Sequence, residues 1–316
     1  MTGSMLDPAS PDAIVIGRLG WAMFAAAAVI LAALTWLALA ALRGRRRPVA
    51  TRWWIVGGGL AFPVVGLTVL LAWSSVTTAR LAHVTSQTPL RIAVTGKMWW
   101  WDIRYTDPAT GREFATANEL HIPVGQPVYL SLGSGDVIHA FWVPALAGKV
   151  DMVPGRLHGL VLHALRAGVY RGQCAEYCGE QHARMALDVV ARPPEEFARW
   201  LAGQAGPASE AAGPASGATL ARGREVFLAQ RCNACHAVRG VTDGAGMAAA
   251  VTAGPDLTHV GSRRRIAAGT LPNHVGTLAG WVADPQAIKP GARMPATRGL
   301  SGADLRALAA WLEALK

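Results

Sequence analysis

The chain has 316 residues, of which 52% are hydrophobic and only 16% are charged, a composition rich in apolar residues for a soluble protein. It favours two or three domains, one of them in a membrane. The net charge is +10, and residues 219–316 hold 12 Lys and Arg against 6 Asp and Glu. Because no nucleic-acid motif accompanies this charge, it indicates a partner with an acidic surface rather than nucleic acid.

Two apolar runs near the N-terminus predict a transmembrane hairpin. After an irregular leader at residues 1–12, residues 19–42 and 53–77 are each long enough to cross a bilayer. A signal peptide would be shorter and would carry its basic residues first. Here the arginines lie between the two runs, so the positive-inside rule places this loop in the cytoplasm. Both termini, and everything from about residue 80 onward, are then expected outside the cytoplasm.

Residues 80–201 are expected to form an all-β domain. Short runs of alternating apolar residues lie between residues 90 and 191 and are separated by glycine-containing turns. This spacing favours a Greek-key sandwich. Residues 194–201 predict a short closing helix.

Soft metal ligands gather within this domain, at Cys174, Cys178, His182 and Met185. Cysteine, histidine and a weak methionine ligand are typical of a one-copper electron-transfer site whose second histidine comes from elsewhere. The additional thiolate of Cys174 allows two copper ions to be bridged. The alternatives are a zinc site and a disulfide. A disulfide leaves His182 and Met185 unexplained, and zinc rarely binds methionine.

A linker and a helical domain follow. Residues 202–218 are rich in Ala, Gly, Pro and Ser and predict a flexible coil, which leads into a domain at residues 219–316. The sequence Cys232-Asn-Ala-Cys235-His236 is the signature of covalent haem c attachment, with His236 as the proximal iron ligand. A bare Cys-x-x-Cys also suits zinc or redox chemistry, but the adjacent histidine and the extracytoplasmic placement favour haem.

The second axial ligand of the haem iron is expected downstream. The segment Pro290-Gly-Ala-Arg-Met294-Pro295 resembles the axial-methionine loop of small cytochromes c. Met247 is the rival, in a Gly/Ala-rich insertion without a following proline. A Met/His pair raises the reduction potential relative to two histidines.

The motif Cys-x-Glu-x-Cys-x3-His-x2-Met at residues 174–185 resembles the copper A centre of cytochrome c oxidase subunit II. The resemblance implies a cupredoxin-like domain in which two cysteines bridge two copper ions. It also implies a further histidine ligand in an Asp-Val-Ile-His setting and a backbone carbonyl ligand. The implied ligands are His139, Cys174, Glu176 through its carbonyl, Cys178, His182 and Met185.

The resemblance assigns roles to further residues. The aromatic cluster Trp99-Trp100-Trp101 corresponds to the surface through which electrons enter copper A. Core packing is the alternative, although successive side chains alternate on a strand, so at least one indole is expected at the surface. The Glu176 side chain would reach a magnesium ion shared with subunit I. Many relatives carry a glutamate on the hairpin near a proton channel, but this chain has no acidic residue between Asp12 and Asp102.

Taken together, the resemblance implies a multidomain protein with a transmembrane hairpin, a copper A domain and a fused cytochrome c domain. It would be subunit II of a bacterial cytochrome c oxidase in the cell inner membrane. Electrons from an external donor, a cytochrome c or a quinol–cytochrome c reductase, would pass through haem c and copper A to subunit I, where oxygen is reduced and protons are pumped. This chain would hold no oxygen site itself.

Two other functions stay open at this point. A copper-A nitric oxide reductase subunit would share the hairpin and the copper loop, and the gas that the complex consumes distinguishes the two. A free-standing electron carrier tethered to the membrane would instead purify without a large partner.

Overall fold

A computed structural model of the chain describes all residues except 1–2, 45–49, 82–89, 108–109, 210–216 and 243–252. The described residues form two compact units. One consists of residues 11–84, and the other of residues 1–10 together with residues 85–316.

The smaller unit is the predicted pair of long helices, and α1 runs without interruption. The second helix has a π-helical stretch, η1, which contains three consecutive glycines. Such stretches interrupt the regular α-helical hydrogen bonding. The elements are α1 (Pro11–Leu42), α2 (Thr51–Trp53), η1 (Trp54–Ala61) and α3 (Phe62–Leu81). By length and composition, both helices can cross a membrane.

Helix α1 begins at Pro11, well before the apolar run at residues 19–42. Proline is well suited to the first helical position because it has no N–H group to leave unpaired there. Asp12 follows in the first turn, where a negative charge is favourable. The arginines at positions 45–47 lie outside the described residues.

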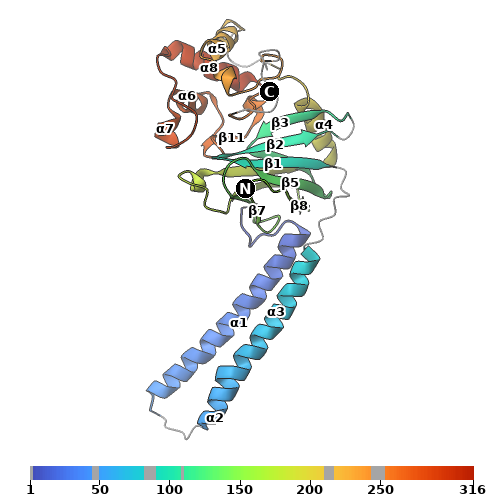
Figure 1. Cartoon of the computed structure of the whole chain (residues 1–316), viewed down its shortest axis with the longest axis vertical. Coiled ribbons are helices and arrows are strands. Elements are labelled where there is room, and N and C mark those ends of the chain that lie inside the picture. The colour runs from blue at the N-terminus through green and yellow to red at the C-terminus, as the bar shows by residue number, and fades with distance from the viewer. Residues whose placement is uncertain (1–2, 45–49, 82–89, 108–109, 210–216, 243–252) are drawn as a thin grey trace. The chain divides into compact units, whose positions relative to one another are not determined.

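The larger unit contains two five-stranded sheets. One is ordered β3-β2-β1-β5-β8 (Figure 1), and the other is ordered β4-β10-β9-β6-β7. Strands β1 and β5 pair in parallel, as do β10 and β4. The strands are β1 (Arg91–Lys97), β2 (Trp100–Thr106), β3 (Glu113–Ala117), β4 (Glu119–Pro123), β5 (Val128–Ser134), β6 (His139–Trp142), β7 (Val150–Met152), β8 (His158–Leu162), β9 (Gly168–Cys174) and β10 (Ala186–Arg192). The predicted cupredoxin-like β-sandwich is confirmed.

Alternation of side chains explains the core of the sandwich. In β1, Ile92 and Val94 are fully buried, whereas their neighbours Arg91 and Ala93 are exposed. Strands β1 and β2 are antiparallel and are joined by a turn at residues 98–99.

The helical domain is built on two helices that pack very closely. An added Cβ on Gly223 of α5 would lie 2.3 Å from the carbonyl oxygen of Ala307 in α8, so only glycine permits this approach. Trp311 and Phe227 fill the adjoining core. The helices are α4 (Pro194–Gln204), which closes the sandwich, and α5 (Gly217–Ala229), α6 (Val275–Ala283), α7 (Pro285–Ile288) and α8 (Gly302–Ala314) of the helical domain. The short elements are η2 (His182–Arg184), η3 (Cys232–Ala234), η4 (Val260–Ser262), β11 (Arg265–Ile266) and β12 (Leu271–Pro272). The predicted all-helical character of this domain is confirmed, apart from the two-residue strands.

The described part of the expected linker is not a free coil. Helix α4 extends to Gln204, and Arg239 of the helical domain donates hydrogen bonds to the carbonyls of Gln204 and Gly206 at 2.8 and 3.3 Å. The backbone N–H of Ser209 donates to the carbonyl of Lys316 at 2.9 Å. The remaining linker residues 210–216 lie outside the described residues.

Polar contacts join the sandwich to the helical domain. The buried carboxylate of Asp188 lies 3.5 Å from Arg171 on its own sheet and 3.4 Å from Arg265 of β11. The carboxylate of Glu119 accepts a hydrogen bond from the backbone N–H of Arg264 at 2.8 Å. These buried charges are paired, as their desolvation requires.

Candidate functional site

The cysteine loop connects β9 to β10. Cys174 is the last residue of β9, His182 begins the short helix η2, and Met185 immediately precedes β10. The backbone N–H of Cys174 donates to the carbonyl of Met185 at 2.9 Å, which ties the two ends of the loop together. The loop therefore turns back on itself and brings its sulfur and nitrogen atoms to one end of the sandwich.

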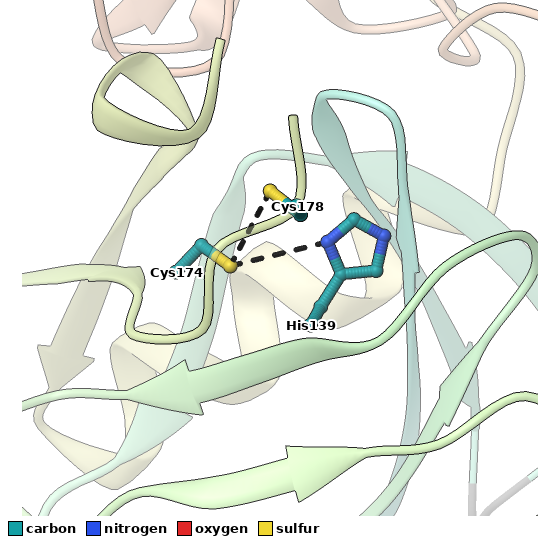
Figure 2. A group of neighbouring side chains, drawn as sticks. All are labelled: His139, Cys174 and Cys178. Atoms are coloured by element: carbon teal, nitrogen blue, oxygen red, sulfur yellow. Dashed lines mark hydrogen bonds between the residues drawn. The ribbon is translucent and has the colours of Figure 1, made fainter. Parts of the chain in front are cut away.

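Figure 2 shows His139 from β6 beside the two cysteines. Its Nδ1 lies 3.9 Å from the Cys174 sulfur, and the two cysteine sulfurs are 3.7 Å apart. His182 Nδ1 and Met185 Sδ lie 3.6 and 3.9 Å from the Cys178 sulfur. The carbonyl oxygen of Glu176 lies 3.1 Å from the Cys174 sulfur. Of the six residues expected from the sequence, two supply the pair of sulfur atoms, and the other four each have an atom within 3.9 Å of one of these sulfurs.

The sulfur–sulfur distance excludes a disulfide in this structure. A disulfide bond is about 2.05 Å long, whereas these sulfurs are 3.7 Å apart and both cysteines are free. Cys174, Cys178, Met185 and His139 are at most 4% exposed. Together with the half-buried His182, this set of two thiols, two imidazoles and a thioether is soft and suits copper, because hard cations prefer oxygen ligands.

The protein favours a thiolate at this site. The hydrogen bond with Cys178, followed by that with His139, lowers the pKa of Cys174, while the same pairing and burial raise the pKa of Cys178. A bound cation would favour the thiolate form of both cysteines.

An aspartate orients His139. Asp136 Oδ1 lies 2.8 Å from His139 Nε2, so that Nδ1 is the nitrogen that faces the sulfurs. Burial lowers the pKa of His139, but the hydrogen bonds with Cys174 and Asp136 raise it more, and the net pKa is above its usual value. A carboxylate on the outer nitrogen is the usual support of a metal-binding histidine.

Gly96 makes room for the His139 ring. An added Cβ at this position would lie 2.8 Å from His139 Cδ2, a distance that real Cβ contacts do not show. The metal-site motif predicted neither the close contact of Gly96 with the ring nor the hydrogen bond of Asp136 to it. The Asp-Val-Ile-His sequence was a usable signal for Asp136, because a short acidic side chain three residues before a ligand can reach it. Gly96 offered no such signal.

The three tryptophans lie in different environments. Trp101 belongs to the sandwich core and packs edge-to-face on Phe141. Trp100 is 9% exposed and packs against Ala268 of the helical domain. Trp99 is half-buried, and its Nε1 donates to the carbonyl of Cys178 at 2.9 Å. At least one indole was expected at the surface. Instead, Trp99 is half-buried, and the helical domain covers Trp100.

A cavity of about 350 Å³ is lined by the residues that the sequence predicts to bind haem. Cys232, Cys235, His236 and Met294 all line it. Part of its wall comes from the sandwich through Trp99, Trp100 and other residues. Met247, the rival of Met294, lies outside the described residues.

His236 has a defined orientation in this cavity. Its Nδ1 donates to the carbonyl of Pro255 at 2.7 Å, which leaves Nε2 free as an acceptor. Burial lowers the pKa of His236, so the ring is neutral. Gly254 packs flat against the ring, and an added Cβ there would lie 2.5 Å from His236 Cε1. A neutral histidine held through its other nitrogen is suited to bind iron.

Comparisons with known proteins agree with this geometry. Residues 90–192 match the family described as "Cytochrome C oxidase subunit II, periplasmic domain", and residues 220–316 match the family described as "Cytochrome c". Cytochrome c oxidase subunit 2 of Bacillus sp. (strain PS3) is 30% identical over 268 residues, which cover 80% of this chain and 72% of that protein. The chain belongs to the cytochrome c oxidase subunit II family.

Other relatives extend the comparison. Cytochrome c oxidase subunit 2 of Alkalihalophilus pseudofirmus is 40% identical over 226 residues, which cover 71% of this chain and 61% of that protein. The crystal structure of the periplasmic domain of subunit II of cytochrome oxidase from Bradyrhizobium japonicum has 34% sequence identity. It covers 38% of this chain and 96% of that one, with a TM-score of 0.36. In the present chain the subunit II domain and the cytochrome c domain are fused.

The expected magnesium ligand lies at the surface of the subunit. The Glu176 carboxylate is 43% exposed and lies 3.5 Å from the Lys149 ammonium, which also contacts Asp151 at 3.2 Å. The side chain is therefore accessible beside the cysteine loop, while its backbone carbonyl faces Cys174.

Proposed function

We propose that this chain is the electron-transfer subunit of a bacterial cytochrome c oxidase, which accepts electrons through a covalently bound haem c. Electrons would then pass through a dinuclear copper A centre to subunit I, where oxygen is reduced to water with proton pumping. The proposal rests on one observation, a connection through Trp99 between the cavity and the cysteine loop. The cavity of the Cys-x-x-Cys-His motif is bounded by Trp99, and Trp99 donates a hydrogen bond to the carbonyl of Cys178.

The residues around the paired sulfurs would hold two copper ions. Cys174, Cys178, His139, His182, Met185 and the Glu176 carbonyl would be the ligands that hold them. When bound, the pair supplies a reversible one-electron redox couple. The protein's own contribution is to exclude water, because the cysteines, Met185 and His139 are buried, and to fix the orientation of His139 through Asp136. A rigid, dry ligand set limits the structural change that accompanies a change of charge.

The cytochrome c domain would hold one haem. Cys232 and Cys235 would form its thioether bonds, with His236 and Met294 as the iron ligands. Of the two candidate methionines, Met294 is supported by its position on the cavity wall. A methionine opposite a histidine favours the high potential that is useful for accepting electrons from a respiratory donor.

Trp99 is the residue that we assign to the connection between the two centres. It lies on the cavity wall, and its indole contacts the backbone of Cys178. Trp100 lines the same wall, whereas Trp101 supports the sandwich from within its core. The proposed electron-input surface therefore consists of Trp99 and Trp100, with Trp101 as its buried support.

The sandwich also presents a face suited to subunit I. Four exposed apolar side chains lie on loops of the sandwich, although lone apolar residues on a surface are common. They are Val137, Ile138, Leu157 and Tyr177. We assign this face, together with Glu176 and a possible shared magnesium ion, to contact with subunit I. The hairpin would anchor the chain in the inner membrane among lipids, with both catalytically relevant domains on the extracytoplasmic side.

Replacing Cys178 with serine in the purified complex tests this function. We expect Cys178→Ser to lose copper and oxygen consumption but to keep the covalent haem, since the haem site lies in the other domain. Ala175→Ser introduces the same side chain into the same loop and should leave both unchanged. Normal copper content and normal oxygen consumption in Cys178→Ser would refute the proposal, as would consumption of nitric oxide in place of oxygen.

A further inference from the structure

A short segment of the cytochrome c domain rests directly on the copper loop. Residues 288–291, here called the docking segment, lead from α7 into the loop that carries Met294. The carbonyl of Ile288 accepts a hydrogen bond from Arg184, and the carbonyl of Pro290 accepts one from the Gln181 side chain. Gln181 and Arg184 flank His182 on the copper loop. The backbone segment that leads to Met294 therefore accepts hydrogen bonds from residues on both sides of His182.

Lys289 is the most deeply inserted residue of the docking segment. It is only 3% exposed, and its Nζ donates to the carbonyl of Trp99 at 2.9 Å. Burying an ammonium group is costly unless it is hydrogen-bonded, so this contact compensates for desolvation only when the two domains are together. Burial lowers the pKa of Lys289 to about 8.

Gly291 explains why the segment can approach so closely. Its φ is +79°, a conformation that other residues rarely adopt. An added Cβ would also lie 2.2 Å from a carboxylate oxygen of Glu180, which immediately precedes Gln181. The backbone conformation therefore favours glycine at this contact, whereas the exposed Glu180 side chain could move away from an added Cβ.

We propose that the docking segment seats the cytochrome c domain on the copper loop, with Lys289 as the positioning residue for electron transfer between the two domains. Its ammonium group fixes the backbone of Trp99, the residue that borders the haem cavity and contacts Cys178. The contact between the docking segment and the copper loop is formed within this chain and does not depend on the proposed function. Only its consequence for electron transfer depends on the proposed function.

Lysine labelling of the unmodified full-length protein tests the seating directly. The chain has four lysines, at positions 97, 149, 289 and 316. With an amine-reactive reagent and mass spectrometry, Lys289 should react at least about tenfold more slowly than Lys149 and Lys316, because protected groups react only through local opening. The side chains of these two reference lysines are 49% and 46% exposed. Equal reactivity of Lys289 and the two reference lysines would overturn the proposal.

A matched pair of variants tests the functional consequence. Lys289→Met removes the ammonium group, and Lys316→Met removes the same charge from an exposed position in the same domain. We expect Lys289→Met to slow electron transfer from haem c to copper A by about tenfold, the equilibrium factor typical of one charged hydrogen bond. Reduction of haem c by the external donor should stay unchanged. Lys289→Arg, which keeps a donor, should restore part of the rate.

The possible outcomes are distinguishable. The pairing of Asp188 with Arg265 remains in Lys289→Met, so the domains should loosen locally without separating. Hydrogen exchange at residues 181–184 should then rise in Lys289→Met but not in Lys316→Met. Identical exchange and identical transfer rates in the two variants would overturn the proposal. If Lys289→Met does not accumulate, the labelling of the unmodified protein decides. A chain that lacks copper but protects Lys289 would refute the proposed function and leave the seating intact.

Discussion

Replacing Gly254 with alanine tests whether the cavity is shaped to hold the His236 ring in one position. The new Cβ would lie 2.5 Å from Cε1 and 2.9 and 3.0 Å from the two ring nitrogens. The backbone N–H of Gly254 is fixed by the carbonyl of Cys235 at 3.1 Å, so the ring must move instead. The ring would then lose its hydrogen bond to Pro255.

The expected cost follows from these two effects. Overpacking of a buried site costs about 1–3 kcal/mol, and the lost hydrogen bond costs about 1 kcal/mol more. Gly254→Ala should therefore destabilise the cytochrome c domain by about 2–4 kcal/mol. The control is Gly280→Ala in α6, where an added Cβ meets nothing within 4 Å. Alanine is favoured over glycine inside a helix by about 0.5–1 kcal/mol, so this variant should be slightly more stable.

Guanidinium unfolding followed by haem absorbance measures both variants, because the haem reports only on its own domain. The midpoint should fall for Gly254→Ala and rise slightly for Gly280→Ala. If both variants unfold at the midpoint of the unmodified protein, the assigned position of the His236 ring is wrong.

Three further predictions concern other parts of the molecule. Trp99→Phe keeps an aromatic ring but removes the Nε1 donor to Cys178, so rapid-mixing absorbance should show slower electron transfer from haem c to copper A and unchanged reduction of haem c. Glu119 is buried, and although burial raises its pKa, the hydrogen bond with His121 and further interactions lower it overall. Its stabilising contribution is therefore complete above the usual glutamate pKa of about 4.3 and is lost as the pH falls through the lower folded pKa. Glu119→Gln should accordingly show a weaker loss of thermal stability between pH 6 and pH 3 than the unmodified protein. The positive charge of residues 219–316 predicts that turnover with an acidic donor slows as ionic strength rises, and turnover that is independent of salt would contradict an acidic partner.

The sequence predicted the fold class because each domain carries a strong local signal. Long apolar runs, short alternating runs and the Cys-x-x-Cys-His motif each depend on residues close together in the chain. The cysteine loop is also local, since Cys174, Cys178, His182 and Met185 lie within twelve residues. Residues this close in the sequence must also lie close together in the folded chain.

Contacts between distant segments could not be predicted in this way. Lys289 and Trp99 are 190 residues apart, and no periodicity relates them. The sequence predicted a flexible linker from its composition, but composition does not reveal that Arg239 binds the carbonyls at the end of α4. Gly96 and Gly254 are likewise recognisable only once the facing histidine ring is known.

The metal and haem content of the purified, correctly matured full-length chain tests the central claim most directly. Elemental analysis, together with the mass of the intact protein, should give two copper ions and one covalently bound haem per chain. Zinc in place of copper, or a mass that shows Cys174 and Cys178 joined as a disulfide, would contradict the account.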